Sequence, residues 1–349
     1  MNRVNLLGMA VAQVRDVAAL AGVSPGTVSN ALNHPDKVLP ATLERVQAAI
    51  DELGYIRNDA ARQLRAGTNQ AIGMIVLDVA NPFFTDVARG VEDVLREQRR
   101  PLILGSSAQD GEREKTYLDL FEQQRMSGVL ITPVGTAIDR LKRLRDRGTS
   151  VVLVDRMTRA KEFSSVSVDD KTGGLLATEH LLSIGRRRIG FIGGPASLPQ
   201  VKNRLAAARA AVDQHDGAEL TFVETITMNA DAGRAGAEQL MDLPKRKRPN
   251  AVFAANDLVA LGVLQALTLA GVRVPDDMAI VGYDDIDFAG SAAIPLTSVH
   301  QPAIEMGSTA AKLLLDVIAA GNDTAHVQHI TLKPELVVRR STVGKTKSS

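Results

Sequence analysis

Polar and aromatic side chains follow the apolar segments of this chain, in a pattern that suits the binding of a hydroxyl-rich small molecule. Six of them carry a carboxylate, amide or guanidinium group, and these are Asp78, Asn81, Asp155, Arg156, Asn256 and Asp284. Phe83 and Phe84 add two aromatic rings in a chain that has only 8 Phe, 3 Tyr and no Trp. An aromatic face packs against the apolar side of a sugar ring, while charged and amide groups bond its hydroxyls. Because Trp is absent, the ligand class stays open between a sugar, a sugar derivative and a nucleobase.

Each of these residues also has a purely structural interpretation. Asp and Asn at strand ends are ordinary turn formers and helix caps. Phe83 and Phe84 can equally be core residues at the start of a helix. Asp257, directly before the apolar run LVALGVLQAL, is the strongest candidate for a helix cap in this part of the chain.

The sequence contains no recognisable catalytic or metal centre. Paired aspartates occur at 169–170 and 284–285, but adjacent side chains point in different directions and set no fixed separation for glycoside hydrolysis. Neither a G-x-S-x-G turn nor a P-loop is present, and the glycines at 193–194 indicate a turn after a strand. His326 and His329 lack a third ligand at a suitable spacing, so we expect them on a surface strand. We therefore predict that the protein is not an enzyme and that it binds neither a metal ion nor a cofactor.

Eight apolar segments of strand length alternate with amphipathic stretches of helix length from about residue 71 onward. The segments are residues 72–78, 101–107, 128–134, 150–156, 188–194, 221–227, 250–256 and 278–284. Continuous apolar strands of this kind form parallel sheets whose two faces are covered by helices. Ligands of such sheets bind beyond the carboxyl ends of the strands, which is where the polar residues stand. The pattern predicts an α/β region with doubly wound parallel sheets.

A different pattern occupies the beginning of the chain. Val14, Val17, Ala18 and Ala21 share one helical face, and Gly22 then stands where a helix would take a C-terminal cap. A second short helix is expected from Pro25, with Ser24 as its N-cap. Its outward face is small and polar, formed by Pro25, Gly26, Ser29, Asn30 and Asn33. Two such helices joined by a tight turn form a helix-turn-helix, whose second helix enters the major groove of DNA.

A third amphipathic helix, residues 40–53, is expected to close a three-helix core, and Gly54 to end it. Leu39, which precedes this helix, has no side-chain oxygen with which to cap it. The missing cap costs about 1 kcal/mol.

Composition narrows the class of protein further. A chain of 349 residues is long enough for two or three folding units. With 41 basic and 40 acidic side chains, any contact with nucleic acid has to be local. There is no Cys, and no apolar run reaches the roughly 18 to 20 residues of a membrane span. The first 12 residues only faintly imitate a secretory signal, with Met9 as an alternative start, so we expect a cytoplasmic protein with no membrane partner.

Four motifs, in this order, resemble the lactose-repressor (LacI/GalR) family of bacterial transcription regulators. They are DVAALAGVSPGTVSNALN, ERVQAAIDELGY, NDAARQLRAG and IGMIVLDVANPFF, and the resemblance extends from about residue 13 to residue 342. It implies an all-α helix-turn-helix headpiece at 13–57, a hinge helix and linker at 58–70, and an effector-binding and dimerisation domain at 71–342. The last domain is expected to be two-lobed and like a periplasmic binding protein. Its N-lobe would hold 71–169 and 302–328, and its C-lobe 170–300 and 329–342, with crossings near Asp169, Gln301 and Ile330.

The resemblance also implies a repressor that binds a near-palindromic operator as a homodimer or tetramer. The implied DNA-binding residues are Ser24, Pro25, Gly26, Thr27, Ser29, Asn30, Asn33, Tyr55, Asn58, Ala61 and Leu64. Many relatives carry an arginine where Asn30 stands, so recognition of the operator sequence by this chain is expected to depend on a contact to adenine and on DNA deformability. Asn58 would cap the hinge helix, Ala61 would pack against its own copy, and Leu64 would be a wedge between base steps in the minor groove.

The effector site follows from the same resemblance. Arg204 matches the ligand-binding arginine of the family, and Gln301 joins Asp155, Asn256 and Asp284 as pocket positions. The full predicted set is Asp78, Asn81, Phe83, Phe84, Asp155, Arg156, Arg204, Asn256, Asp284 and Gln301. A small molecule between the lobes, expected to be a sugar, would control the repression of carbohydrate-utilisation genes. The competing interpretation is a periplasmic-type sugar-binding protein without DNA function.

Overall fold

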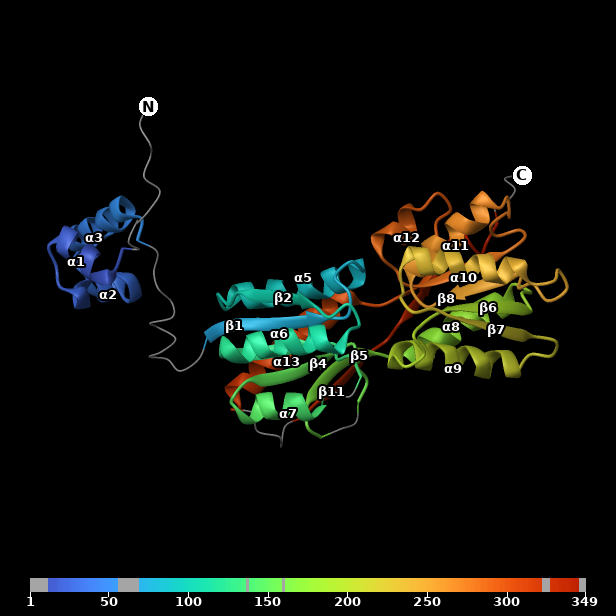
Figure 1. The fold of residues 1–349 in the computed structure, drawn as a ribbon, viewed down its shortest axis with the longest axis horizontal. Helices are drawn as coiled ribbons and strands as arrows, with labels where there is room; N and C mark the ends of the chain where they lie inside the picture. Colours follow the sequence, from blue (N-terminus) through green and yellow to red (C-terminus); the bar gives the residue numbers. More distant parts are fainter. Residues whose placement is uncertain (1–11, 56–68, 136–137, 159–160, 322–326, 345–349) are drawn as a thin grey trace, which may run out of the picture. The chain divides into compact units, whose positions relative to one another are not determined.

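The structure is a computed structural model that describes residues 12–55, 69–135, 138–158, 161–321 and 327–344. These residues form two compact units, one within residues 1–67 and the other within residues 68–349 (Figure 1). None of the described helices is long and apolar enough to cross a membrane.

The first unit is a three-helix headpiece. Its helices are α1 (Val14–Ala21), α2 (Pro25–Asn33) and α3 (Pro40–Leu53), with the short 3-10 helix η1 (Pro35–Lys37) before α3. They enclose a small core of Val17, Ala18, Ala21, Val28, Ala31, Val46 and Ala49. Every core residue is Val or Ala, so the helices pack closely, as a helix-turn-helix requires.

The predicted caps of the headpiece are confirmed. Gly22 takes a left-handed conformation at φ 65° and closes α1, and Gly54 does the same for α3 at φ 55°. The Ser24 hydroxyl oxygen accepts the Thr27 N–H at 3.1 Å, which caps α2 with Pro25 as its first residue. Leu39 supplies no side-chain bond to α3, as its side chain predicts.

The N-lobe of the second unit is built on one parallel sheet, in the order β11-β5-β4-β3-β1-β2. Its strands are β1 (Asn69–Val76), β2 (Leu102–Ser106), β3 (Met126–Ile131), β4 (Ser150–Val154), β5 (Ser164–Val168) and β11 (His329–Leu332). Helices α5 (Pro82–Glu97) and α13 (Ala303–Ala319) cover one face, and α6 (Gly111–Gln123) and α7 (Ile138–Asp146) cover the other. The axes of α5 and α13 approach closely at Gly90, where a Cβ atom would lie 2.1 Å from the Ile304 carbonyl oxygen.

The C-lobe repeats this plan with the order β12-β10-β9-β8-β6-β7 (Figure 1). Its strands are β6 (Arg188–Gly193), β7 (Glu219–Glu224), β8 (Ala251–Ala254), β9 (Ala279–Asp284), β10 (Thr297–His300) and β12 (Glu335–Val337). All neighbours are parallel except β12, which runs antiparallel to β10. Helices α8 (Asp170–Ser183) and α9 (Pro199–Asp213) pack as one pair, and α10 (Ala230–Asp242) and α11 (Asp257–Leu269) as the other, with the short α12 (Asp287–Ser291) beside α11.

The eight predicted strands are all present, but four further strands were missed. These are β5 (SSVSV), β10 (TSVH), β11 (HITL) and β12 (ELV), none of which has a continuous apolar run. The chain passes between the lobes after Val168, after His300 and after Leu332. The expected limits were wrong at 329–332, because β11 pairs in parallel with β5 and therefore belongs to the N-lobe. His329 lies on this strand and is exposed, as predicted, whereas His326 lies outside the described residues.

Candidate functional site

A small cavity of about 20 Å³ lies where the carboxyl ends of the strands of both lobes meet. Its walls are Leu77, Asn81, Phe83, Phe84, Asp155, Gln200, Arg204, Met228, Asn256, Asp284 and Gln301. A water molecule needs about 10 to 15 Å³ of such space, so the cavity has room for little more than one. A larger molecule therefore reaches these groups only when the lobes move apart.

Eight of the ten predicted effector residues line this cavity, and two do not. Asp78 instead accepts the Ala80 N–H at 2.9 Å within a turn, and Arg156 follows Asp155 outside the cavity wall. Gln200 was missed, although the sequence holds a signal for it. It stands four residues before Arg204, which places both side chains on one face of α9. Leu77 and Met228 were missed as well, because nothing in their type distinguishes them from core residues.

Two carboxylates close the cavity by reciprocal bonds between the lobes. Asp155 follows β4 in the N-lobe and accepts Gln200 Nε2 of the C-lobe helix α9 at 2.8 Å. Asp284 ends β9 in the C-lobe and accepts Asn81 Nδ2 at 3.0 Å, where Asn81 is the N-cap of the N-lobe helix α5. Gln301 Nε2 donates to the other oxygen of Asp284 at 2.7 Å. Each lobe thus presents one carboxylate to an amide of the other lobe.

Both carboxylates stand on backbone in the left-handed region. Asp155 has φ 51° and Asp284 has φ 103°, and Asp285 next to it has φ 57°. Such a conformation costs a non-glycine residue about 1 to 3 kcal/mol and persists where the surrounding structure enforces it. Here the turn directs each carboxylate toward the opposite lobe.

Arg204 is held by a buried polar cluster behind the cavity. Its side chain is buried, its Nε donates to Asp170 at 2.8 Å, and its Nη1 donates to the Ala255 carbonyl at 2.7 Å. The guanidinium lies 3.5 Å from the centroid of the Tyr283 ring, which it covers. Burial by itself lowers the pKa of Arg204, but Asp170 and the other acidic groups around it raise that pKa above its ordinary value. The cation is therefore permanently charged and largely neutralised by Asp170.

Burial also raises the pKa values of Asp155 and Asp284, the two carboxylates that close the cavity, toward neutral pH. It raises the pKa of Asp155 to about 7, and the Asp170 carboxylate acts in the same direction, against Arg204 and Gln200. Burial raises the pKa of Asp284 to about 6, although Arg204 and the amides of Asn81 and Gln301 favour its charged form. Protons at these two positions are thus exchanged close to neutral pH.

Asn256, and not Asp257, caps α11, so the expectation for Asp257 was wrong. Asn256 Oδ1 accepts the Val259 N–H at 2.9 Å, and its Nδ2 donates to the Met228 carbonyl at 3.1 Å. Asp257 is the first residue of the helix and is fully buried. Both residue types are good caps, and only the point at which the chain leaves β8 decides between them.

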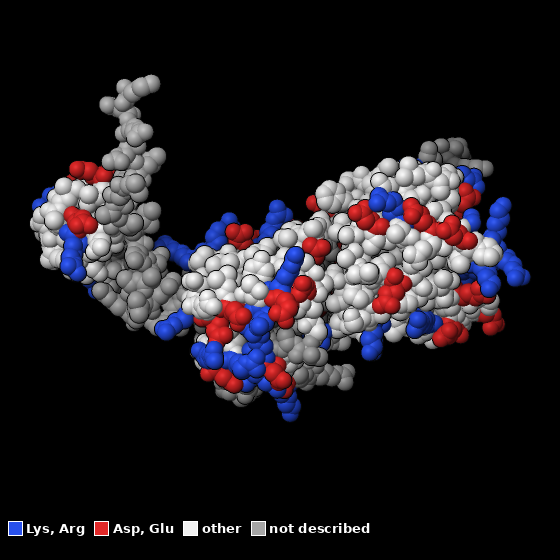
Figure 2. All heavy atoms as spheres, viewed as in Figure 1, with Lys and Arg blue, Asp and Glu red and all other residues white. Residues whose placement is uncertain are grey.

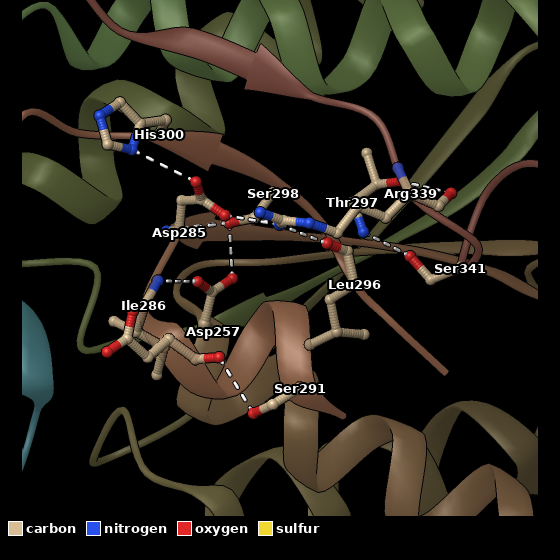
Figure 3. Close-up of polar contacts among 11 residues, drawn as sticks. Asp257, Asp285, Ile286, Ser291, Leu296, Thr297, Ser298, His300, Arg339 and Ser341 are labelled. Carbon is tan, nitrogen blue, oxygen red and sulfur yellow. Dashed lines mark hydrogen bonds and ion pairs between the residues drawn. The ribbon is translucent and has the colours of Figure 1, made fainter. Parts of the chain in front are cut away.

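Asp257 belongs to a polar network that fixes the turn after β9 (Figure 3). The Ser298 hydroxyl donates to Asp257 at 2.6 Å and accepts the Asp285 N–H at 3.1 Å. Asp285 pairs with Arg339 at 2.5 Å and with His300 at 3.3 Å. Burial raises the pKa of Asp285, but the bonds from His300 and Arg339 outweigh it and hold that pKa below its ordinary value. The network keeps the turn that carries Asp284 in place.

A second cavity, of about 350 Å³, adjoins the first and shares Phe83, Asp284 and Gln301 with it. Its other walls come from Asp86, Asp285, Ile286, Asp287, His300, Pro302, Ala303, Ile304 and Glu305. Its volume lies within the range of about 300 to 1,000 Å³ that is usual for ligand pockets. Of the polar groups of the small cavity, Asp284 and Gln301 thus also line a space large enough for a small organic molecule.

In the headpiece, four of the five residues predicted on the outward face of α2 are exposed, and Ser29 is half-buried. Pro25, Gly26, Asn30 and Asn33 are exposed, and Asn33 Nδ2 donates to the Ser29 carbonyl at 2.8 Å. Ser24 and Thr27 bond each other through their hydroxyl oxygens at 3.0 Å. Tyr55 packs against the headpiece core, and Asn58, Ala61 and Leu64 lie outside the described residues.

The charge on the second unit is mixed. Figure 2 shows Lys and Arg interspersed with Asp and Glu over the face in view, without one broad field of either sign. The whole chain has a formal net charge of +1 at pH 7. Polyanion binding by this chain therefore depends on particular contacts and not on an overall positive charge.

Two family models match the chain. One, described as bacterial regulatory proteins of the lacI family, matches residues 13–58, and one for a periplasmic binding protein-like domain matches residues 178–342. The HTH-type transcriptional repressor PurR of Aliivibrio fischeri is 33% identical over 344 residues, which are 97% of this chain and 100% of that protein. PurR of Haemophilus influenzae is 33% identical over 336 residues, with 95% and 98% covered.

Solved structures resemble the chain over nearly all of its length or over a large part of it. The transcriptional regulator CelR in complex with cellobiose is 33% identical, with a TM-score of 0.68 and 95% of this chain and 99% of that chain covered. A LacI family regulator from Enterococcus faecium with bound ribose is 31% identical, with a TM-score of 0.71 and 78% and 98% covered. The Lac repressor dimer bound to operator and the anti-inducer ONPF is 26% identical, with a TM-score of 0.81 and 96% and 100% covered.

Proposed function

The chain belongs to the lacI family of bacterial regulatory proteins, and we propose that it is a transcriptional repressor whose grip on operator DNA is controlled by a small molecule between its lobes. It acts by binding and not by catalysis, in the cytoplasm, as a homodimer on a near-palindromic operator. A sugar or related polyol is the effector. The observation that carries this proposal is the presence, in one chain, of an exposed helix-turn-helix and a two-lobed site closed by carboxylate–amide pairs.

The exposed face of α2 supplies the DNA contacts. Asn30 is an exposed amide on this face, and an Asn side chain matches the N6 and N7 edge of adenine. Gly26 has no side chain with which to read a base, and Pro25 touches at most a thymine methyl. Ser24, Thr27 and Ser29 hold phosphates, and Asn33 and Tyr55 support the helix from its end and from the core. Asn58, Ala61 and Leu64 lie outside the described residues, and for them the proposal keeps the roles that the family resemblance implies, with Leu64 as the wedge between base steps.

The effector acts through the movement of the lobes. Asp155, Arg204, Asn256, Asp284 and Gln301 lie at the inner cavity, so a bound molecule shifts the balance between separated and closed lobes. That shift is passed to the headpieces through the N-lobes of the dimer. Couplings of this kind amount to about 1 to 3 kcal/mol.

The test is operator binding by the full chain and by a variant with Asn30→Ala, on promoter fragments from beside its own gene. We expect the variant to bind about 5 to 150 times more weakly, the equivalent of 1 to 3 kcal/mol for one bidentate base contact. Gln47→Ala on α3, an exposed amide bonded within its own helix to Asp51, is the matched control and leaves affinity unchanged. If no fragment is bound with or without sugars, the alternative of a sugar-binding protein without DNA function takes its place.

A further inference from the structure

Basic side chains gather at the end of the C-lobe that lies away from the inner cavity. Residues 186–188 are three consecutive arginines that lead into β6, and residues 245–248 have the sequence KRKR in the loop before β8. The two segments are in contact, because the Arg188 backbone N–H donates to Asn250 Oδ1 at 3.2 Å and Arg188 Nε donates to the Arg248 carbonyl at 2.8 Å. Parallel strands bind ligands at their carboxyl ends, so this basic patch, at the amino ends, lies remote from the cleft.

The arginines of the basic patch are held in place without being neutralised. Arg186 Nη2 donates to the Pro275 carbonyl at 2.5 Å. Arg187 Nη1 donates to the Leu182 carbonyl at 2.6 Å, and Arg248 Nη2 bonds backbone carbonyls as well. A carbonyl oxygen fixes the direction of a guanidinium but carries no formal charge, so each of these arginines keeps its full positive charge.

No ion pair involves the basic patch within the part of the chain that the structure describes, although a neighbouring cation is paired. The acids beside Arg186 are Asp276 and Asp277, and both pair with Arg273. Their charge is therefore largely spent on a cation outside the patch.

The loop before β8 presents the mobile part of this charge to solvent. Lys245, Arg246 and Lys247 are all exposed, and no hydrogen bond among the described residues uses their side chains. Asp242 at the end of α10 and Glu219 at the start of β7 are acids of the adjoining segments, so the patch keeps an excess of positive charge. Charges within about 10 Å of one another act together on a polyanion at physiological salt.

We propose that the basic patch is a second, sequence-independent DNA contact, which binds the phosphates of duplex DNA while the headpiece reads the operator. One step rests on the proposed function: a chain held on DNA by its headpiece meets phosphates at a high local concentration. Lys and Arg bind such phosphates without regard to base sequence. The patch contains no aromatic residue, so it lacks the platforms on which the bases of single-stranded nucleic acid stack.

The first experiment measures the affinity of the full chain for duplex DNA without an operator, over a range of salt concentrations. The variant combines Lys245→Gln, Arg246→Gln and Lys247→Gln, which leaves the arginines that bond the backbone untouched. We expect its affinity to fall about tenfold or more at low salt, because phosphate contacts dominate non-specific binding. The slope of log affinity against log salt should become shallower by about 2 to 3, since each phosphate contact contributes about 0.9.

A dispersed triple variant is the matched control. Lys115→Gln, Arg143→Gln and Arg209→Gln change the net charge equally, at exposed positions on α6, α7 and α9, and should keep the salt slope of the unchanged chain. If the patch variant keeps that slope, or if the control loses as much, the proposal is overturned. Operator binding by the unchanged chain is measured beside these samples. Its absence would refute the repressor function, whereas the difference between the two triple variants would still decide the patch.

The second experiment locates the contact on the unchanged sequence by lysine acetylation and mass spectrometry. Duplex DNA should slow the acetylation of Lys245 and Lys247 and leave the exposed Lys115 unchanged. Equal reactivity of Lys245 and Lys247 with and without DNA would overturn the proposal. Polyglutamate, a polymer of carboxylates, tests the rival partner. Protection by polyglutamate and not by DNA would assign the patch to an acidic protein and would overturn the DNA contact.

Discussion

The N-lobe and the C-lobe share one strand order but bring different chemistry to the cleft between them. Strands β4 and β9 hold the same place in their sheets, and each leads into one carboxylate, Asp155 or Asp284, on left-handed backbone. Strands β1 and β6 also correspond, and the amide that bonds the opposite carboxylate stands at the start of the helix after each strand, with Asn81 as the N-cap of α5 and Gln200 as the second residue of α9. The two hydrogen bonds between the lobes are thus related by a pseudo-twofold axis, although the sequence contains no internal repeat.

What the lobes do not share is the remainder of the wall. The N-lobe adds the edge-to-face pair Phe83 and Phe84, with ring centroids 5.0 Å apart. The C-lobe adds Arg204, which is fixed between Asp170 and the Tyr283 ring. The comparison teaches that closure is carried by equivalent positions, whereas the aromatic pair and the buried cation have no counterpart across the cleft.

The largest test of this asymmetry is to remove the cation that only the C-lobe has. Arg204→Met leaves Asp170 buried without its partner, so we expect about 3 to 5 kcal/mol to be lost from the free energy of unfolding. Denaturant unfolding of the full chain measures it, and the exposed Arg209→Met on the same helix should be nearly neutral. If both variants unfold alike, the buried pair is not what distinguishes the C-lobe.

A pH series compares the two equivalent carboxylates. Burial raises the pKa of Asp155 from 3.8 to about 7 and that of Asp284 to about 6, so between those limits the folded chain binds more protons than the unfolded chain. The contribution of each group to the free energy of unfolding is therefore fully present below pH 4 and is lost as the pH rises through the pKa of the folded state. Each unit by which the folded pKa exceeds the unfolded pKa corresponds to about 1.4 kcal/mol.

We expect Asp155→Asn to flatten this fall between pH 4 and pH 7, and Asp284→Asn to flatten it less, because its pKa is raised less. Unfolding free energies at half-unit pH steps provide the measurement. A larger effect from Asp284→Asn than from Asp155→Asn would contradict this ranking of the two carboxylates.

The amide donors test the pseudo-twofold relation itself. Asn81→Ala and Gln200→Ala each remove one hydrogen bond to a buried carboxylate, which is worth about 1.5 to 3 kcal/mol. We expect both to favour separated lobes to a similar extent, visible as a larger radius of gyration in small-angle X-ray scattering. Asn81 also caps α5, so Asn81→Ser, which keeps a cap, is the fairer partner of Gln200→Ala. If only one of the two variants increased the radius of gyration, only that amide–carboxylate bond would hold the lobes together.

The smallest effect concerns strands β5 and β10, which correspond across the lobes. Ser298 on β10 donates to the buried Asp257, whereas the equally buried Ser167 on β5 forms no hydrogen bond with a carboxylate of the described residues. Ser298→Ala should cost about 1 to 3 kcal/mol and Ser167→Ala less than about 1 kcal/mol. Chemical denaturation decides, and equal costs would mean that the Asp257 network adds nothing particular to the C-lobe.

Much of this arrangement could be predicted from residue types at strand ends. Eight apolar runs identified eight strands, and the polar residues after them converge because parallel strands end at one edge. The strands that were missed are polar or short, and they become strands only because a neighbouring strand supplies the other half of their hydrogen bonds. Such pairing is not a property of their own sequence.

The site shows the same limit. Asp155, Asp284 and Asn256 stand at strand ends and were found there, whereas Gln200 lies within a helix and reaches the cavity only through the fold of the other lobe. Adjacent Asn256 and Asp257 were assigned in the wrong order because either can cap a helix. The roles given to the individual cavity and headpiece residues remain predictions.

The three passages of the chain between the lobes have a consequence for synthesis on the ribosome. The headpiece is complete by Gly54, but the N-lobe sheet still lacks β11 and the cover of α13 until residue 332 has been made. The nascent chain thus acquires its DNA-reading part long before the part that senses a ligand. A product that stops near residue 300 would keep the headpiece and expose the apolar side of α5, which makes it a candidate for aggregation or proteolysis.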